Sequence, residues 1–165
     1  MTILSGKRGL IVGVANERSA AWGIAKKASD LGAELAFTYQ IPAFEKRIAP
    51  LAESVKSDIM IPCDLSEEAA AKRAMEQLST YWSEVDFVVH AVGFSDKQEL
   101  SGAYYNTSRQ NFRQTMLISA FSFTELAQAS APMMPNGGSL LTLSYLGSVR
   151  TTPNYNVMGV AKAAL

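Results

Sequence analysis

Residues 9–23 read Gly-Leu-Ile-Val-Gly-Val-Ala-Asn-Glu-Arg-Ser-Ala-Ala-Trp-Gly. The first six residues are apolar in succession rather than in alternation, which is typical of a strand buried on both faces. An Ala-rich segment begins at Ala20 and runs to Leu31. The stretch therefore predicts a buried β-strand that passes through a short turn into a helix.

The same order repeats along the chain. Apolar runs lie at residues 9–14, 34–39, 58–62, 87–92 and 139–144, and helix-like segments lie at 20–31, 43–55, 67–82 and 108–131. Gly32 is placed to end the first helix, and Ser66, followed by two acidic residues, to cap the third. This alternation predicts an α/β fold of the Rossmann-like kind, a doubly wound parallel sheet with helices on both faces.

Composition excludes several functional classes. The 165 residues carry 15 basic and 15 acidic side chains, so no positive excess favours nucleic acid as a partner. One cysteine, Cys63, and one histidine, His90, suggest neither a disulfide nor a metal site. The uncharged stretch 126–149 is broken by prolines and glycines, and the N-terminus lacks a signal-peptide pattern, so we expect a cytoplasmic protein without membrane insertion.

The last ten residues, 156–165, have the pattern of a helix that has only begun. Ending there would leave the fifth strand, Leu140–Leu143, as an exposed apolar edge. We therefore expect residues 1–165 to form a single dinucleotide-binding domain from the N-terminal part of a longer protein.

The turn after the first strand has the features that a dinucleotide needs. Gly13 permits close approach of a pyrophosphate to the backbone, and Ser19 and Ala20 open a helix whose N-terminus attracts phosphate. Gly23 would let that helix pack closely on the sheet. The usual G-x-G-x-x-G is absent, so the alternative of ordinary turn glycines stays open.

Three residues at the ends of later strands extend this hypothesis. Gln40 can contact the adenosine ribose without a charge, which favours NAD over NADP. Asp64 can accept from an adenine amino group or serve as a helix cap, and Gly93 either admits a nucleotide or merely ends its strand. We expect His90 to be a satisfied, partly buried residue and Cys63 a small core residue.

Tyr155 and Lys162 are seven residues apart, about two helical turns, and should share one helix face. An ammonium close to a phenol lowers the phenol's pKa, and such a tyrosine can donate to a developing oxyanion. Without other motifs, the pair could equally consist of a surface lysine and a tyrosine at the start of a helix, with no catalytic role.

Together the glycine turn, Asp64, Gly93 and Tyr-x6-Lys resemble the short-chain dehydrogenase/reductase superfamily. Ordinary members have a catalytic tyrosine four residues before the lysine (Tyr-x3-Lys), but here Met158 lies four residues before Lys162. Over its whole length the chain resembles the bacterial NADH-dependent enoyl-acyl-carrier-protein reductases. The resemblance is carried by the Tyr-x6-Lys form and by residues 32–40 (Gly-Ala-Glu-Leu-Ala-Phe-Thr-Tyr-Gln), 141–147 (Leu-Thr-Leu-Ser-Tyr-Leu-Gly) and 153–159 (Pro-Asn-Tyr-Asn-Val-Met-Gly).

The resemblance implies NADH as cofactor, an enoyl-acyl carrier protein as substrate, a homotetramer, and a C-terminal part that carries a mobile substrate-binding loop. The same resemblance implies that Tyr155 binds the thioester carbonyl and that Lys162 binds the nicotinamide ribose. It also implies that Tyr145 and Met158 contact the substrate. The cofactor contacts that the resemblance implies are Gly13, Ser19, Ala20, Gln40, Asp64, Leu65, Val92 and Gly93. Val92 is a conservative exchange for the isoleucine that is usual in the family.

Three other interpretations stay open. A 3-oxoacyl thioester reductase of the same superfamily would carry the Tyr-x3-Lys that this chain lacks. A non-catalytic nucleotide-binding module would make Tyr155 and Lys162 incidental, and the piece could also be a defective fragment of an active parent.

Overall fold

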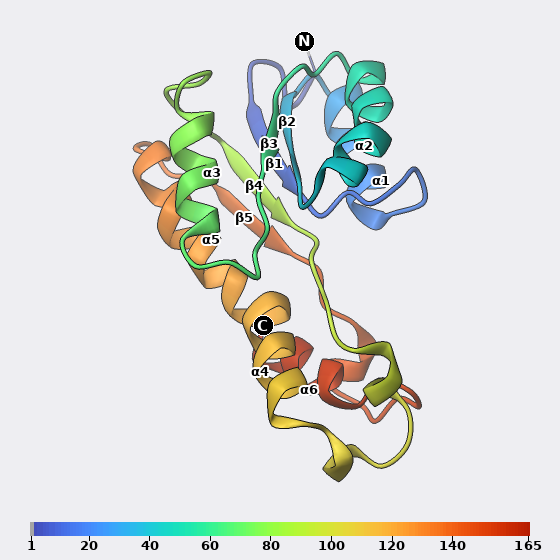
Figure 1. Cartoon of the computed structure of the whole chain (residues 1–165). Coiled ribbons are helices and arrows are strands. Elements are labelled where there is room, and N and C mark those ends of the chain that lie inside the picture. The colour runs from blue at the N-terminus through green and yellow to red at the C-terminus, as the bar shows by residue number, and fades with distance from the viewer. Residues whose placement is uncertain (1) are drawn as a thin grey trace.

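A computed structural model of the chain describes residues 2–165. Its centre is a parallel sheet of five strands in the order β3-β2-β1-β4-β5 (Figure 1). The strands are β1 (Arg8–Val12), β2 (Glu34–Tyr39), β3 (Met60–Pro62), β4 (Phe87–His90) and β5 (Ser139–Thr142). All five follow the predicted apolar runs, and every pairing between them is parallel.

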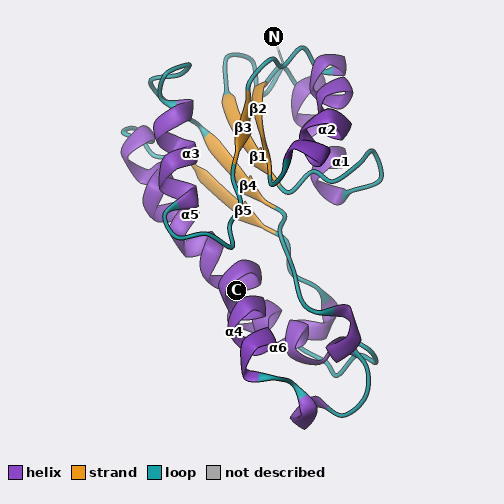
Figure 2. Ribbon diagram, in the orientation of Figure 1, coloured by secondary structure: helices purple, strands orange, loops and turns teal. Residues whose placement is uncertain are grey.

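Helices cover both faces of the sheet, with α1 (Ala20–Asp30) and α2 (Pro42–Ser54) on one and α3 (Ala70–Leu78) and α5 (Ser122–Ser130) on the other (Figure 2). Each strand sends side chains alternately to the two layers. Leu10 packs with α3 and α5, whereas its neighbour Ile11 packs with α1 and α2. Burial on both faces explains why the runs are apolar in succession, and the doubly wound, Rossmann-like fold is confirmed.

The segment predicted as one helix over 108–131 is continuous but irregular. It consists of α4 (Arg109–Met116), a π-helical turn η3 (Leu117–Phe121), α5 and a 3-10 turn η4 (Ala131–Met133). The 3-10 turns η1 (Lys97–Leu100), η2 (Tyr104–Asn106) and η5 (Leu146–Ser148) and the last helix, α6 (Asn156–Ala164), complete the chain. Helices α4 and α6 lie beyond the carboxyl ends of the strands (Figure 1).

Two local predictions are wrong. Ser66 does not cap the third helix, because α3 begins only at Ala70 after the left-handed Ala69, and the Ser66 amide and hydroxyl instead donate to Asp64. Gly23 does not serve close packing within residues 2–165, since no described atom would lie within 4 Å of a Cβ there. Gly32, by contrast, has a φ of +92° directly after α1, as a helix-ending glycine should.

Strand β5 is an edge strand within residues 2–165, and Leu140 and Leu141 on it are 38% and 45% exposed. These side chains give the apolar edge that the sequence predicts. None of the helices described between residues 2 and 165 has the length and apolar character needed to cross a membrane.

Candidate active site at the strand ends

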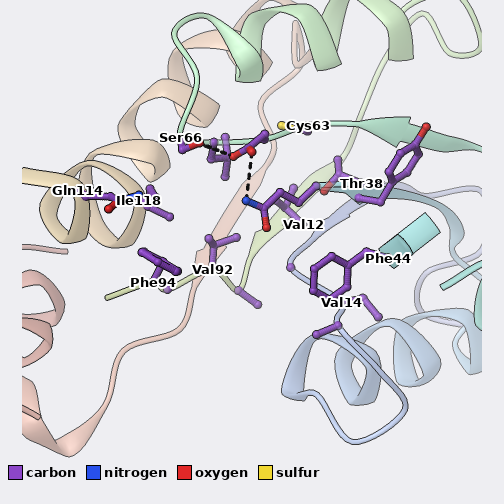
Figure 3. Close-up of a pocket in the computed structure, with 18 residues that line it drawn as sticks. Val12, Val14, Thr38, Phe44, Cys63, Ser66, Val92, Phe94, Gln114 and Ile118 are labelled. Atoms are coloured by element: carbon purple, nitrogen blue, oxygen red, sulfur yellow. Dashed lines mark hydrogen bonds between the residues drawn. The ribbon is translucent and has the colours of Figure 1, made fainter. Parts of the chain in front are cut away.

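A cavity of about 280 Å³ opens where β1, β2, β3 and β4 end (Figure 3). Six of the residues predicted to contact a cofactor line it: Gly13, Gln40, Asp64, Leu65, Val92 and Gly93. Three do not: Ser19 is the N-cap of α1 and its hydroxyl donates to the Asn16 carbonyl, Ala20 lines a separate groove beside β5, and Lys162 lies behind the lining, next to Gly93. The structure thus gathers residues from four strand ends, where parallel α/β sheets bind ligands.

Gly13 is required by the close approach of β1 and β4. Its φ is +103°, and a Cβ at this position would collide with the carbonyl of Ala91 at the end of β4. Side chains other than hydrogen are therefore excluded on both conformational and steric grounds. The absence of a side chain leaves the backbone of this turn open to the cavity.

Gln40 and Asp64 meet across the cavity from the ends of β2 and β3. The Gln40 Nε2 donates to Asp64 Oδ2 at 3.1 Å, and the Ser66 amide and hydroxyl donate to Asp64 Oδ1 at 2.9 and 2.7 Å (Figure 3). Burial alone would raise the pKa of the Asp64 carboxyl, but these hydrogen bonds outweigh it and lower the pKa. An ionised carboxylate therefore lies at one end of the cavity.

Lys162 joins α6 to the end of β4. Its buried ammonium donates to the carbonyl oxygens of Val92 and Leu143, each at 3.0 Å, and burial lowers its pKa. A Cβ on Gly93 would lie 3.7 Å from Lys162 Cε and 3.8 Å from Met158 Cε. Lys162, Met158 and Gly93 are consequently neighbours, as their predicted roles require.

Tyr155 and Tyr145 form an aromatic pair, with ring centroids 4.9 Å apart and planes tilted by 60°. Tyr155 is half-buried at the N-cap of α6, and Tyr145 is 52% exposed. The expectation that Lys162 lowers the pKa of Tyr155 is wrong, because burial, aided by Tyr145, raises that pKa. The phenol therefore stays protonated at neutral pH, and its chemistry is that of a hydrogen-bond donor.

His90 and Cys63 have the structural roles predicted for them, although His90 is fully rather than partly buried. Its Nδ1 bonds Thr142 at 2.9 Å and its Nε2 bonds Ser122 at 2.8 Å. Burial and the charge of Lys162 lower its pKa to about 4, and burial raises the pKa of Cys63 to about 11. In the part of the chain described, no three His, Cys, Asp or Glu side chains are arranged to hold a metal ion.

Sequence reasoning missed the serine that holds the cavity wall after β4. The buried Ser119 hydroxyl accepts from the amide of Phe94 and donates to its carbonyl, both at 2.9 Å. Ser119 lies in the π-helical turn η3, and the cavity lining that sequence reasoning also missed includes Phe94, Gln114 and Ile118 (Figure 3). Serines on the apolar side of a predicted helix were the available signal, since a buried hydroxyl needs a partner.

Comparisons with known proteins agree with this arrangement. Residues 13–165 match the family model described as enoyl-(acyl carrier protein) reductase. The chain is 56% identical over 163 residues to enoyl-[acyl-carrier-protein] reductase [NADH] 2 of Rhizobium meliloti, covering 99% of this chain and 61% of that protein.

Two solved structures are also similar. The crystal structure of FabI from Candidatus Liberibacter asiaticus has a TM-score of 0.98 and 55% identity, covering 100% of this chain and 64% of that one. The reductase of Anaplasma phagocytophilum in complex with NAD has a TM-score of 0.96 and 51% identity, covering 99% and 63%. This chain thus spans less than two thirds of the length of these relatives, and it belongs to the enoyl-(acyl carrier protein) reductase family.

Proposed function

We propose that this protein reduces the trans-2 double bond of an enoyl thioester on acyl carrier protein with NADH, the last reductive step of fatty acid elongation. The observation that carries the proposal is the bond from the Lys162 ammonium to the Val92 carbonyl. It fixes α6, whose N-cap is Tyr155, against the cavity at the strand ends. The Tyr155 phenol, which lines a separate cavity beside η5, is thereby held on the element next to the proposed nucleotide site.

The residues lining the cavity fit a nicotinamide dinucleotide. Asp64 offers an ionised acceptor for an adenine amino group, and Gln40 offers an uncharged side chain beside the adenosine ribose. Gly13 and Gly93 leave backbone accessible, and Lys162 stands next to Gly93 for the second ribose. Ser19 and Ala20 remain proposed contacts at the start of α1, and Leu65 and Val92 proposed cavity walls.

NADH held by these residues would supply the hydride that is added to the β-carbon of the enoyl thioester. As the new C–H bond forms at the β-carbon, negative charge develops on the thioester carbonyl oxygen. The Tyr155 hydroxyl is proposed to donate a hydrogen bond to this oxygen. Its raised pKa retains the proton at neutral pH. Tyr145 and Met158 are proposed to line the substrate side, and a proton from solvent, added to the α-carbon, completes the reduction.

We further propose a cytoplasmic homotetramer in which residues 1–165 form one dinucleotide-binding domain. An apolar stripe on α4 and η3 supports assembly, because Phe112, Leu117 and Phe121 are 40%, 38% and 52% exposed. Light scattering coupled to size exclusion tests the oligomeric state.

The activity is tested by following NADH consumption with a trans-2-enoyl thioester and, separately, with a 3-oxoacyl thioester. Intact mass is measured on the same preparation. Consumption with the enoyl substrate alone supports the proposal. Consumption with the oxo substrate alone would assign the protein to the ordinary reductases, and NADH binding without either turnover would indicate a nucleotide-binding module.

A further inference from the structure

The residue after Tyr155 has an unusual backbone and an unusual set of partners. Asn156 has a φ of +27° and Asn154 a φ of +57°, so Tyr155 lies between two residues in the left-handed region. Asparagine tolerates this region better than most residues, yet such a conformation persists only where the surroundings hold it. Something must therefore fix the chain on the C-terminal side of Tyr155.

The Asn156 side chain supplies that fixation. Its Nδ2 donates to the carbonyl oxygen of Glu99 at 3.0 Å and lies 3.4 Å from those of Ser101 and Gly102. All three acceptors belong to η1 or the turn that follows it, more than fifty residues earlier in the chain. The amide thus ties the first turn of α6 to the segment that leads from β4 to α4.

That segment is itself anchored at its other end. The Glu99 carboxylate accepts from the Ser108 amide at 2.7 Å and from its hydroxyl at 2.8 Å, and these bonds lower the pKa of Glu99. Ser108 caps α4 by accepting from the Asn111 amide at 3.1 Å. Glu99 therefore links the two helices: its carboxylate bonds Ser108 at the start of α4, and its backbone carbonyl bonds Asn156, the residue beside Tyr155.

We propose that Asn156 is a positioning residue for Tyr155: by clamping η1 to the start of α6, it holds the phenol in the orientation needed to donate to the substrate oxygen. The inference rests on the proposed function of Tyr155. Asn156 touches neither cofactor nor substrate in this role and acts only through its neighbour. Misplacement of a donor by about 1 Å costs about 100-fold in rate, so the effect falls on turnover.

Asn156→Asp tests the clamp, because aspartate keeps the size and the tolerance of positive φ but cannot donate. We expect kcat to fall about 10- to 100-fold with the Kd for NADH unchanged. Asn106→Asp is the matched control, since Asn106 is exposed on the neighbouring turn η2, and it should leave both values unchanged.

A double-variant cycle separates positioning from general damage to the fold. If Asn156 acts through the Tyr155 hydroxyl, Asn156→Asp should cost little further activity in a Tyr155→Phe background. Equal losses in both backgrounds, or an unchanged kcat in the single variant, would overturn the inference.

A spectroscopic measurement keeps the inference testable without turnover. With tyrosine labelled by ¹³C at Cζ, the Tyr155 resonance is the one lost in Tyr155→Phe. We expect that resonance to shift in Asn156→Asp and to stay in place in Asn106→Asp. An unmoved resonance would contradict the clamp even if neither thioester were reduced, whereas a moved resonance in an inactive protein would refute the proposed function alone.

Discussion

The ring of Tyr155 packs directly over the Cα of Gly147, where a Cβ would lie 2.7 Å from the Tyr155 Cε1 atom. Gly147 lies in η5, between β5 and α6, and its carbonyl would in turn meet a Cβ on Gly159 at 2.9 Å. The two glycines thus allow η5, α6 and the Tyr155 ring to pack together. The position of the Tyr155 ring therefore depends on the absence of side chains at Gly147 and Gly159.

Gly147→Ala should therefore displace the Tyr155 ring and lower kcat about 10- to 100-fold, while NADH affinity is retained. Gly23→Ala is the control, because a Cβ there has no neighbour within 4 Å among residues 2–165 and alanine favours the helix. Steady-state kinetics and NADH titration of both variants check this. Equal kcat values for the Gly147 variant and the parent would show that the ring position does not matter.

Tyr155→Phe should lower kcat about 100-fold or more and change KM much less, because the hydroxyl is used mainly as charge develops on the substrate oxygen. The raised pKa of Tyr155 adds a second expectation. Because its pKa is raised above the ordinary value of 10.0, this group should cause no decline of kcat between pH 7 and 9. A pH profile of kcat that falls between pH 7 and 9 would count against Tyr155 as the donor.

Cofactor choice should depend on Gln40 and Asp64 together. Gln40→Arg introduces a partner for a 2′-phosphate, but the Asp64 carboxylate, now 3.1 Å from Gln40 Nε2, would compete for that guanidinium. We expect a modest shift toward NADPH in Gln40→Arg and a larger one in Gln40→Arg/Asp64→Asn. The ratio of kcat/KM for the two cofactors measures it, and an unchanged ratio in the double variant would place the ribose elsewhere.

His90 should make the fold sensitive to acid. Its pKa is about 4 when folded against 6.5 in its ordinary state, so the unfolded chain binds the proton first as pH falls. Stability should therefore decline from about pH 6.5 to pH 4, by about 3 kcal/mol in total. His90→Gln should remove this part of the slope in urea unfolding at several pH values, and an identical slope would contradict it.

The sequence predicts the sheet, its helices and most of the cavity because these follow from periodicity and from the ends of strands. It does not predict the π-helical turn that places Ser119 on Phe94, since that turn depends on packing against the segment after β4. Nor does spacing alone reveal the raised pKa of Tyr155. Two helical turns place Lys162 on the same helix, but its ammonium is held by Val92 and Leu143, and burial decides the pKa.

Transfer of deuterium from C4-deuterated NADH to a trans-2-enoyl thioester tests the central claim most directly. We predict a saturated acyl product that carries one deuterium at its β-carbon, and at least about 100-fold less of it from Tyr155→Phe in the same time. A deuterated 3-hydroxyacyl product formed from the 3-oxoacyl substrate, with no label entering the enoyl substrate, would contradict the assignment.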